Sequence, residues 1–276
     1  MLPVLLALGT ALGYGVANYL APVLGRRMPL GAVLLGSQVA GLTVSVLLTL
    51  GADVGLSGTG LALAGAAGAS NAAALACFYR AARTGNLSVV SPIGASGAAV
   101  PVLVGLAAGD RPGLLAAVGI PLVLVGVVLA ARRPAAGAGD RTAGVGWALA
   151  AAVLVGTFLT TYAGAAAESS PGALLWSRVA LVATTAVGVL ALRAPLRVVP
   201  RDAALTLVPG LLLALATFAF GEATRAGLLS VVSVIATLNP VVTVALAFVL
   251  LRERPAPVQR VGAGLALLGI VLLAGA

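Results

Sequence analysis

The sequence predicts an all-α integral membrane protein with ten transmembrane helices, arranged as two inverted repeats of five helices each. Three observations lead to this prediction: a very apolar composition, ten apolar stretches long enough to cross a bilayer, and a duplicated segment. Of the 276 residues, 61% are hydrophobic and 8% are charged, and the mean hydropathy is +1.16. Soluble domains have about 25% charged residues. The composition therefore favours a protein that lies in a lipid bilayer.

Each predicted helix is an apolar stretch close to the roughly 20 residues that span about 30 Å of hydrocarbon. The expected spans cover residues 3–24, 30–50, 59–79, 86–108, 113–131, 143–163, 172–192, 203–221, 228–251 and 257–275. The first span lacks a basic segment before it, so we expect a retained helix rather than a signal peptide.

The stretch RRPAAGAGDRT, residues 132–142, predicts a linker because its charges, Pro and Gly interrupt the apolar pattern. The predicted domains are a first repeat at 1–131 and a second repeat at 143–276, with five helices in each.

A duplicated segment indicates that the second half is a copy of the first. Phe78–Ile93 aligns without a gap with Phe220–Ile235, and the five residues 87–91 are identical to residues 229–233. After a one-residue slip, two further pairs align, which are Gly119 with Gly262 and Gly126 with Gly269. Because five is odd, the second copy must enter the membrane from the opposite side. Inverted repeats of this kind build secondary transporters with a substrate site near the bilayer midplane.

The arginines predict the orientation. The chain has no Lys, so all 16 positive charges are Arg, and most of them lie in the connections after the odd-numbered spans. Only Arg111 and Arg225 lie in the other connections. The positive-inside rule then places the odd connections in the cytoplasm and both termini outside. Arginines with this role do not indicate a nucleic-acid partner.

The residue types argue against an enzyme and against a cofactor. The chain has no His, which removes the commonest general base and metal ligand, and Cys77 is its only cysteine. Gly94-Ala95-Ser96-Gly97 fits a nucleophile pattern of intramembrane serine proteases, but such a serine needs a general base. We therefore expect no catalytic residue, no cofactor and no metal site.

Polar residues inside the predicted spans are the candidates for a central substrate cavity. Hydroxyls and amides can hydrogen-bond a polar solute, but hydroxyls can equally bond to their own helix and amides can join two helices. Pro92 and Pro240 are candidate hinges or static kinks. The candidate substrate-binding residues are Asn18, Gln38, Asn71, Ser91, Ser96, Arg178, Ser233, Thr237 and Asn239.

Ionisable and aromatic residues in the spans allow two interpretations each. Arg178 could anchor an anionic group, or its side chain could extend to the nearby membrane interface. Tyr14 and Tyr162 could line a pore or lie in an interfacial aromatic belt. Glu222 and Arg225 are one helical turn apart, and this spacing favours a local ion pair.

The stretch from Asn239 to Ala274 is NPVVTVALAFVLLRERPAPVQRVGAGLALLGIVLLA, with a Pro in the helix, an acidic residue after it and a Gly-punctuated last helix. With this stretch as its most specific part, the chain resembles the ten-helix EamA type of the drug/metabolite transporter superfamily, and the resemblance covers essentially all of the chain. Arg178 is similar to the family's frequent Arg near the start of the second helix of a repeat, where the first half has Ser37-Gln38. In the first half, Asp110 stands where the family usually has Glu.

The resemblance implies a transporter of the cytoplasmic membrane, with efflux of an amino acid or a related small polar metabolite by alternating access. The implied partners are the small-molecule substrate and the lipid bilayer, for a monomer or a homodimer. A passive channel or facilitator for small solutes is the alternative, because it needs the same helices and polar lining. Members of this family are commonly drawn with both termini in the cytosol, whereas the arginines of this chain predict the opposite orientation.

Overall fold

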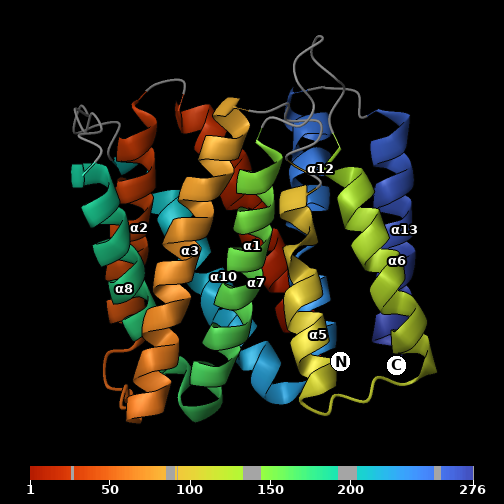
Figure 1. The fold of residues 1–276 in the computed structure, drawn as a ribbon, viewed down its shortest axis with the longest axis horizontal. Coiled ribbons are helices and arrows are strands. Elements are labelled where there is room, and N and C mark those ends of the chain that lie inside the picture. The colour runs from red at the N-terminus through yellow and green to blue at the C-terminus, as the bar shows by residue number, and fades with distance from the viewer. Residues whose placement is uncertain are drawn as a thin grey trace.

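The computed structural model describes residues 1–25, 28–84, 91, 93–132, 144–191, 204–251 and 256–275, and it is helical throughout these ranges apart from short turns. Figure 1 shows the helices side by side in a bundle. Their bounds are α1 Leu2–Gly25, α2 Leu30–Leu48, α3 Gly58–Thr84, the 3-10 helix η1 Ser96–Ala98, α5 Ala99–Ala107, α6 Leu114–Ala130, α7 Val145–Glu168, α8 Ser170–Ala191, α10 Leu207–Ala226, α11 Leu229–Ala236, α12 Asn239–Leu251 and α13 Pro257–Ala274.

The helices have the length and composition of membrane spans. Among the described residues, 8 stretches are long and apolar enough to cross a membrane, and the stretches Ile93–Ala107 and Leu114–Ala130 are apolar but shorter. Large apolar side chains such as Leu2, Leu47 and Leu190 are exposed on the outside of the bundle. Such a surface is costly in water and suits lipid. The prediction of an all-helical, multi-pass membrane protein is confirmed, and the eight long stretches fall at eight of the ten predicted spans.

The ninth predicted span, 228–251, is interrupted in the structure. Helix α11 ends at Ala236, and α12 begins at Asn239. Pro240 lacks a backbone N–H and its ring crowds the carbonyl one turn earlier, which ends a regular helix at this point. The interruption therefore lies directly before one of the two predicted hinges. The other, Pro92, lies outside the described residues.

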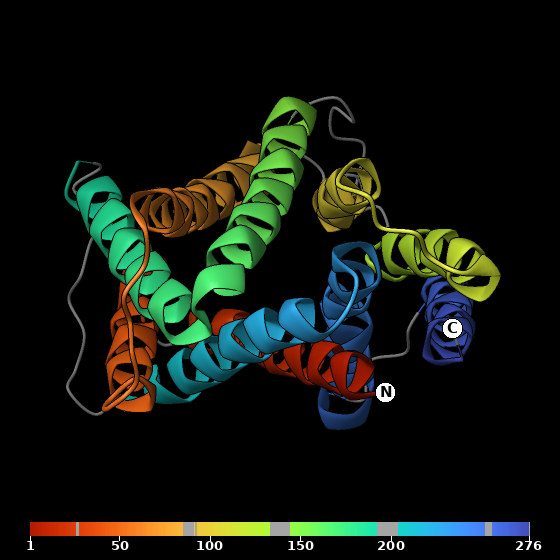
Figure 2. The ribbon, with the colours of Figure 1, turned by 90° about the horizontal axis from the view of Figure 1, so that it is seen from below.

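Helices from the first and second halves of the sequence alternate in the bundle. Helix α3 packs against α7 and α8, and α10 packs against α1 and α2. Seen from below, α1 lies beside α10, and α6 lies beside α13 at the far end of the molecule from α8 (Figure 2). Most of the core is therefore made between the two halves rather than within either of them.

Glycine lets two of these helix pairs approach closely. A Cβ added to Gly210 of α10 would lie 2.5 Å from the Cβ of Ala40 and 2.7 Å from the carbonyl oxygen of Ser37, both in α2. A Cβ on Gly68 of α3 would clash with the carbonyl oxygen of Ser177 in α8. Small residues allow this approach, and dispersion between closely packed backbones then stabilises helix pairs in a membrane.

Both chain termini lie at the same end of the bundle, toward the lower side of Figure 1, and we call this the termini end. A Cβ on Gly227, after α10, would lie 2.8 Å from the Cβ of Pro3 in the first turn of α1. The carboxylate of Asp110 accepts a hydrogen bond from the backbone N–H of Ser230 in α11 at 2.9 Å. These contacts bring the N-terminus and the connections after α5 and α10 together at this end.

Candidate functional site

Arg178 is the centre of a polar cluster inside the bundle. It lies in the ninth position of α8, Ser170–Ala191, and its side chain is only 2% exposed. Its Nη1 donates to Oε1 of Gln38 in α2 at 3.0 Å, and its Nη2 donates to the backbone carbonyl of Leu213 and to Oγ1 of Thr217, both in α10. One guanidinium therefore joins three helices, one of which belongs to the first half of the sequence.

Thr217 connects this arginine to a fourth helix. Its hydroxyl donates to the carbonyl of Leu213 one turn earlier, at 2.7 Å. The Tyr14 hydroxyl of α1 lies 2.9 Å from the same Oγ1. Since the Thr217 proton is already donated, Tyr14 is the donor in this contact. We call Tyr14, Gln38, Arg178 and Thr217 the arginine cluster.

Every acceptor of Arg178 is electrically neutral: an amide, a backbone carbonyl and a hydroxyl. The four carboxylates of the described residues have other hydrogen-bond or ion-pair partners. Asp53 accepts from Gly55, Asp110 from Ser230 and Glu168 from Ser57, and Glu222 pairs with Arg225 at 3.8 Å. Arg178 is thus a buried cation with no ion pair among the described residues. Charges at membrane depth are costly, and for that reason they mark functional sites.

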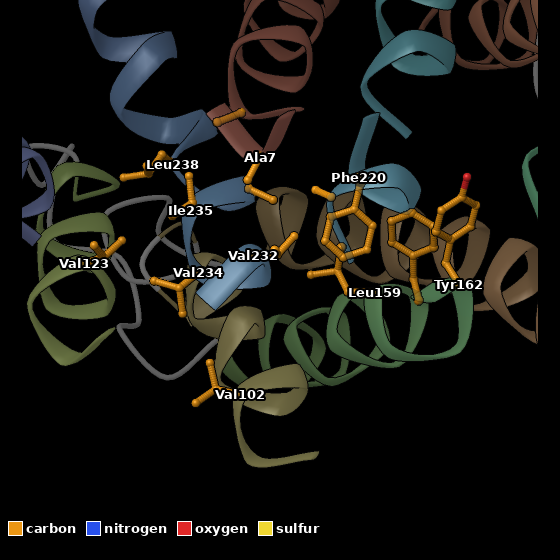
Figure 3. Packing of buried hydrophobic residues seen from close by; sticks show 14 of the residues in the cluster. Ala7, Val102, Val123, Leu159, Tyr162, Phe220, Val232, Val234, Ile235 and Leu238 are labelled. Carbon is orange, nitrogen blue, oxygen red and sulfur yellow. The ribbon is translucent and has the colours of Figure 1, made fainter. Parts of the chain in front are cut away.

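The Tyr162 side chain of α7 adds an unpartnered hydroxyl beside the cluster. Its ring packs against Phe220 at a centroid distance of 6.1 Å, and Figure 3 shows the hydroxyl oxygen at the edge of the apolar side chains. The hydroxyl is fully buried, has no hydrogen-bond partner in the described part of the chain, and lies within electrostatic range of Tyr14, Arg178 and Glu222. A buried hydroxyl without a partner costs free energy, so a hydrogen bond to this oxygen would recover that cost.

Two of the predicted site residues, Gln38 and Arg178, contact each other, although they are 140 positions apart in the sequence. The interpretation in which Arg178 extends to the membrane interface is wrong, because its side chain is buried and points into the bundle. Gln38 is also buried and holds the guanidinium from α2.

Asn18 lies on the inward side of α1 and still keeps an exposed side chain. It follows Tyr14 by four residues, so the two share one helical face, whereas the exposed Leu5 and Leu12 lie on a different face. Tyr14 is itself only half-buried. The surface left uncovered at Tyr14 and Asn18 therefore belongs to the inside of the bundle. Asn71 also lies inward, on the face of α3 that carries the buried Ala67 and Ala74.

The other predicted site residues divide into three groups by their hydrogen bonds and burial. Ser96 donates to the carbonyl of Ile93 at 2.7 Å and Thr237 to that of Val234 at 2.9 Å, so both bond to nearby backbone in their own segment, as small hydroxyls often do. Ser233 is fully buried and has no partner among the described residues. Ser91 and Asn239 are half-buried, on the segments before η1 and at the start of α12.

Contacts at the termini end fasten the connection between α2 and α3 to the corner between α7 and α8. The Glu168 carboxylate accepts from the backbone N–H and from the hydroxyl of Ser57, each at 2.9 Å. The Trp176 Nε1 donates to the carbonyl of Val54 at 3.2 Å. The predicted ion pair between Glu222 and Arg225 is also present, with an exposed fraction of 45% for the arginine. These polar groups hold the termini end together and do not reach the arginine cluster.

Thr217 was not among the predicted residues, and Tyr14 and Tyr162 were considered only as lining or belt residues. The sequence offers little signal for Thr217, since an isolated Thr in an apolar helix usually bonds to its own backbone. Tyr14 could have been found from its position one turn before Asn18, because two polar residues on one face of a membrane helix mark an inward side.

Residues 142–275 match the EamA-like transporter family. The family that this half matches is the one that the resemblance implied. Members of this family are membrane transporters of the drug/metabolite type, and the match therefore indicates such a transporter. No curated protein gives a match.

A solved structure shares the fold along the whole length. It is titled "Crystal structure of protein", superposes with a TM-score of 0.82 at 17% sequence identity, and the likeness covers 98% of this chain and 95% of the other. At this identity the likeness establishes the fold alone. The likeness of fold includes the first half of the chain, which the family match does not reach.

Proposed function

We propose that this protein is a secondary transporter that moves a small polar metabolite out of the cell across the cytoplasmic membrane by alternating access. The observation that carries this proposal is the arginine cluster, a set of polar and charged side chains inside a bundle whose outside is apolar. Polar groups at membrane depth are retained where they serve a solute or ion path. An amino acid or a related compound is the substrate that we favour, because of the family.

The mechanism that we propose needs two inverted halves of five helices each, and matching contacts in the two halves support it. Gly68 of α3 lies on Ser177 of α8, and Gly210 of α10 lies on Ser37 of α2. Gly156 of α7 lies against Gly97, and Gly15 of α1 lies against Asn239. Within each of these two pairs of contacts, the residues of one contact lie about 140 positions from the corresponding residues of the other contact. A two-fold axis in the membrane plane would produce this correspondence. In this mechanism, small rotations between the halves open the cluster to one side at a time.

The proposed orientation follows from the described arginines. Arg80 and Arg83 lie near the end of α3, Arg132 follows α6 and Arg260 lies in the first turn of α13, all at the end of the bundle away from the termini. Arg111 and Arg225 are near the termini end. The positive-inside rule places the arginine-rich end in the cytoplasm.

Transport is tested by comparing metabolites inside and outside cells that make the protein with those of cells that lack it. We expect one class of small polar compounds to accumulate outside, and the Asn71→Ala variant to reduce this accumulation. Counterflow in proteoliposomes then separates the transporter from a channel or facilitator. A flux that is never saturable and shows no counterflow would contradict alternating access, and no flux of any solute would contradict transport itself.

The inverted halves are tested with cysteines at matching positions. Arg83 and Arg225 align in the duplicated segment, and both are exposed. In a background with Cys77→Ala, Arg83→Cys should react with a membrane-impermeant maleimide from the cytoplasm and Arg225→Cys from outside. Labelling of both cysteines from one face would contradict the inverted arrangement.

A further inference from the structure

The interior of the described bundle has an unbalanced positive charge. Arg178 donates three hydrogen bonds to neutral acceptors, which leaves two of the five N–H donors of a guanidinium unused in the described contacts. Neutral acceptors satisfy donors but do not cancel a charge. In a low dielectric this field reaches farther than it would in water, and it favours an anionic group nearby.

The groups around Arg178 suit an anion better than a cation. Tyr14 and Thr217 are neutral hydroxyls, and the buried Tyr162 hydroxyl has a proton to donate and no partner in the described structure. The nearest carboxylate on α10 is Glu222, and it is half-exposed and paired with Arg225. A solute with a carboxylate would find a cation and an O–H donor here, whereas an ammonium group would find only a carboxylate that already pairs with Arg225.

A space for such a solute is indicated by the exposed part of α1. Tyr14 joins the cluster through Thr217, and Asn18 lies one turn further along the same inward face with an uncovered amide. A solute beside Tyr14 and Asn18 would therefore be adjacent to the guanidinium. Closer contact with Arg178, which is almost fully covered, requires α2, α8 and α10 to separate, and alternating access supplies such a movement.

We propose that Arg178 makes the path selective for solutes that carry a carboxylate, with Tyr162 as a second donor to that carboxylate, so that anions and zwitterions pass faster than cations. This inference rests on the proposed transport function and names the chemical class of its substrate. The competing interpretation is that Arg178 only joins α2, α8 and α10. The two differ in what they predict for the charge preference of transport.

The experiment uses three probes with one side chain and three charges. Proteoliposomes are loaded with equal amounts of N-acetyl-L-leucine, L-leucine and L-leucinamide, which carry charges of about −1, 0 and +1 at neutral pH. Release is measured relative to liposomes without protein. We expect the two carboxylates to leave about tenfold faster than the amide, a ratio typical of one charge-assisted hydrogen bond.

Variants of Arg178 and Tyr162 test whether these residues cause the preference for carboxylates. Arg178→Gln should abolish the preference, Arg178→Lys should retain part of it, and Tyr162→Phe should reduce release of the carboxylates without reducing thermal stability. Arg225→Gln is the matched control, because this arginine lies in the same half but is exposed at the termini end. It should leave the preference unchanged.

The outcomes separate the inference from the proposed function. Equal release of all three probes by the unmodified protein, or faster release of the amide, would overturn the charge selectivity and leave transport standing. A preference that persists in a folded Arg178→Gln protein would overturn the role of Arg178. Release of no probe by the unmodified protein, combined with no metabolite difference between cells, would overturn transport and with it this inference.

Discussion

Two helix pairs, α6 with α13 and α2 with α8, join corresponding parts of the two sequence halves, and they do so by opposite means. In the first pair the four aligned glycines meet crosswise, each one opposite the aligned partner of the other glycine on its helix. A Cβ on Gly126 would lie 2.7 Å from the carbonyl oxygen of Gly262, and one on Gly119 would lie 3.0 Å from that of Gly269. In the second pair the aligned residues differ, and Arg178 of one helix donates to Gln38 of the other.

If the halves are copies, as the duplicated segment predicts, the two pairs differ in how far their residues can diverge. Close backbone packing needs the absence of a side chain on both helices, so α6 and α13 both have to keep their glycines. A cation needs an acceptor rather than a second cation, so the α2 and α8 positions have to differ. Figure 2 places these pairs at opposite ends of the molecule.

The largest loss of stability is expected for Gly262→Val, in the pair of α6 with α13. A side chain here meets the backbone at Ala130 and Gly126, which cannot move aside as a flexible side chain can. We expect a loss of about 3 kcal/mol in the free energy of unfolding, the upper range for overpacking. Thermal unfolding in detergent measures it. Gly264→Val on the same helix is the control, because a Cβ there meets nothing within 4 Å. Equal losses in both variants would contradict close backbone packing at Gly262 as the cause of the loss.

A smaller loss is expected for Gln38→Leu. This change removes the acceptor of a buried charged donor, at a cost of about 2 kcal/mol, whereas a bond between neutral groups is worth about half of that. The double variant Gln38→Leu with Arg178→Met should recover most of the loss, since the unsatisfied charge is then gone. Thr43→Val on the same helix is the control, because its hydroxyl bonds only to its own helix. Additive losses in the double variant would contradict the coupling of these two residues.

The smallest loss is expected for Tyr14→Phe, which removes one hydroxyl contact of the cluster and should lower stability by about 1 kcal/mol. Tyr162→Phe is the matched control, because the Tyr162 hydroxyl that it removes has no described acceptor or donor. Its stability should stay the same or rise. A larger loss for Tyr162→Phe than for Tyr14→Phe would mean that the Tyr162 hydroxyl has a structural partner.

Much of the fold could be predicted because each membrane helix has its own local signal. The predicted span 257–275 differs by one residue from Pro257–Ala274, and 172–192 agrees closely with Ser170–Ala191. The interruption between Ala236 and Asn239 was only partly predicted, since Pro240 indicates a kink but not how many residues leave the helix. The count of ten crossings and the inverted arrangement remain predictions.

The candidate site was harder to predict. Two of its members, Gln38 and Arg178, stand out in apolar stretches as an amide and a charge. Their contact could not be foreseen, because it depends on how α2 and α8 approach each other. Thr217 gives no signal of its own, since its role arises only when Arg178 and Tyr14 reach the same oxygen.

Composition and periodicity were enough to establish a helical membrane protein, because burying backbone polar groups in lipid permits few alternatives to a helix. The duplicated segment was enough to relate the two halves. The direction in which Arg178 points was left open by the sequence, since a long side chain near a span end can reach either water or the interior. The packing of the helices decides that the side chain points into the bundle, because α2 and α10 supply neutral acceptors for the guanidinium there. No described carboxylate pairs with it.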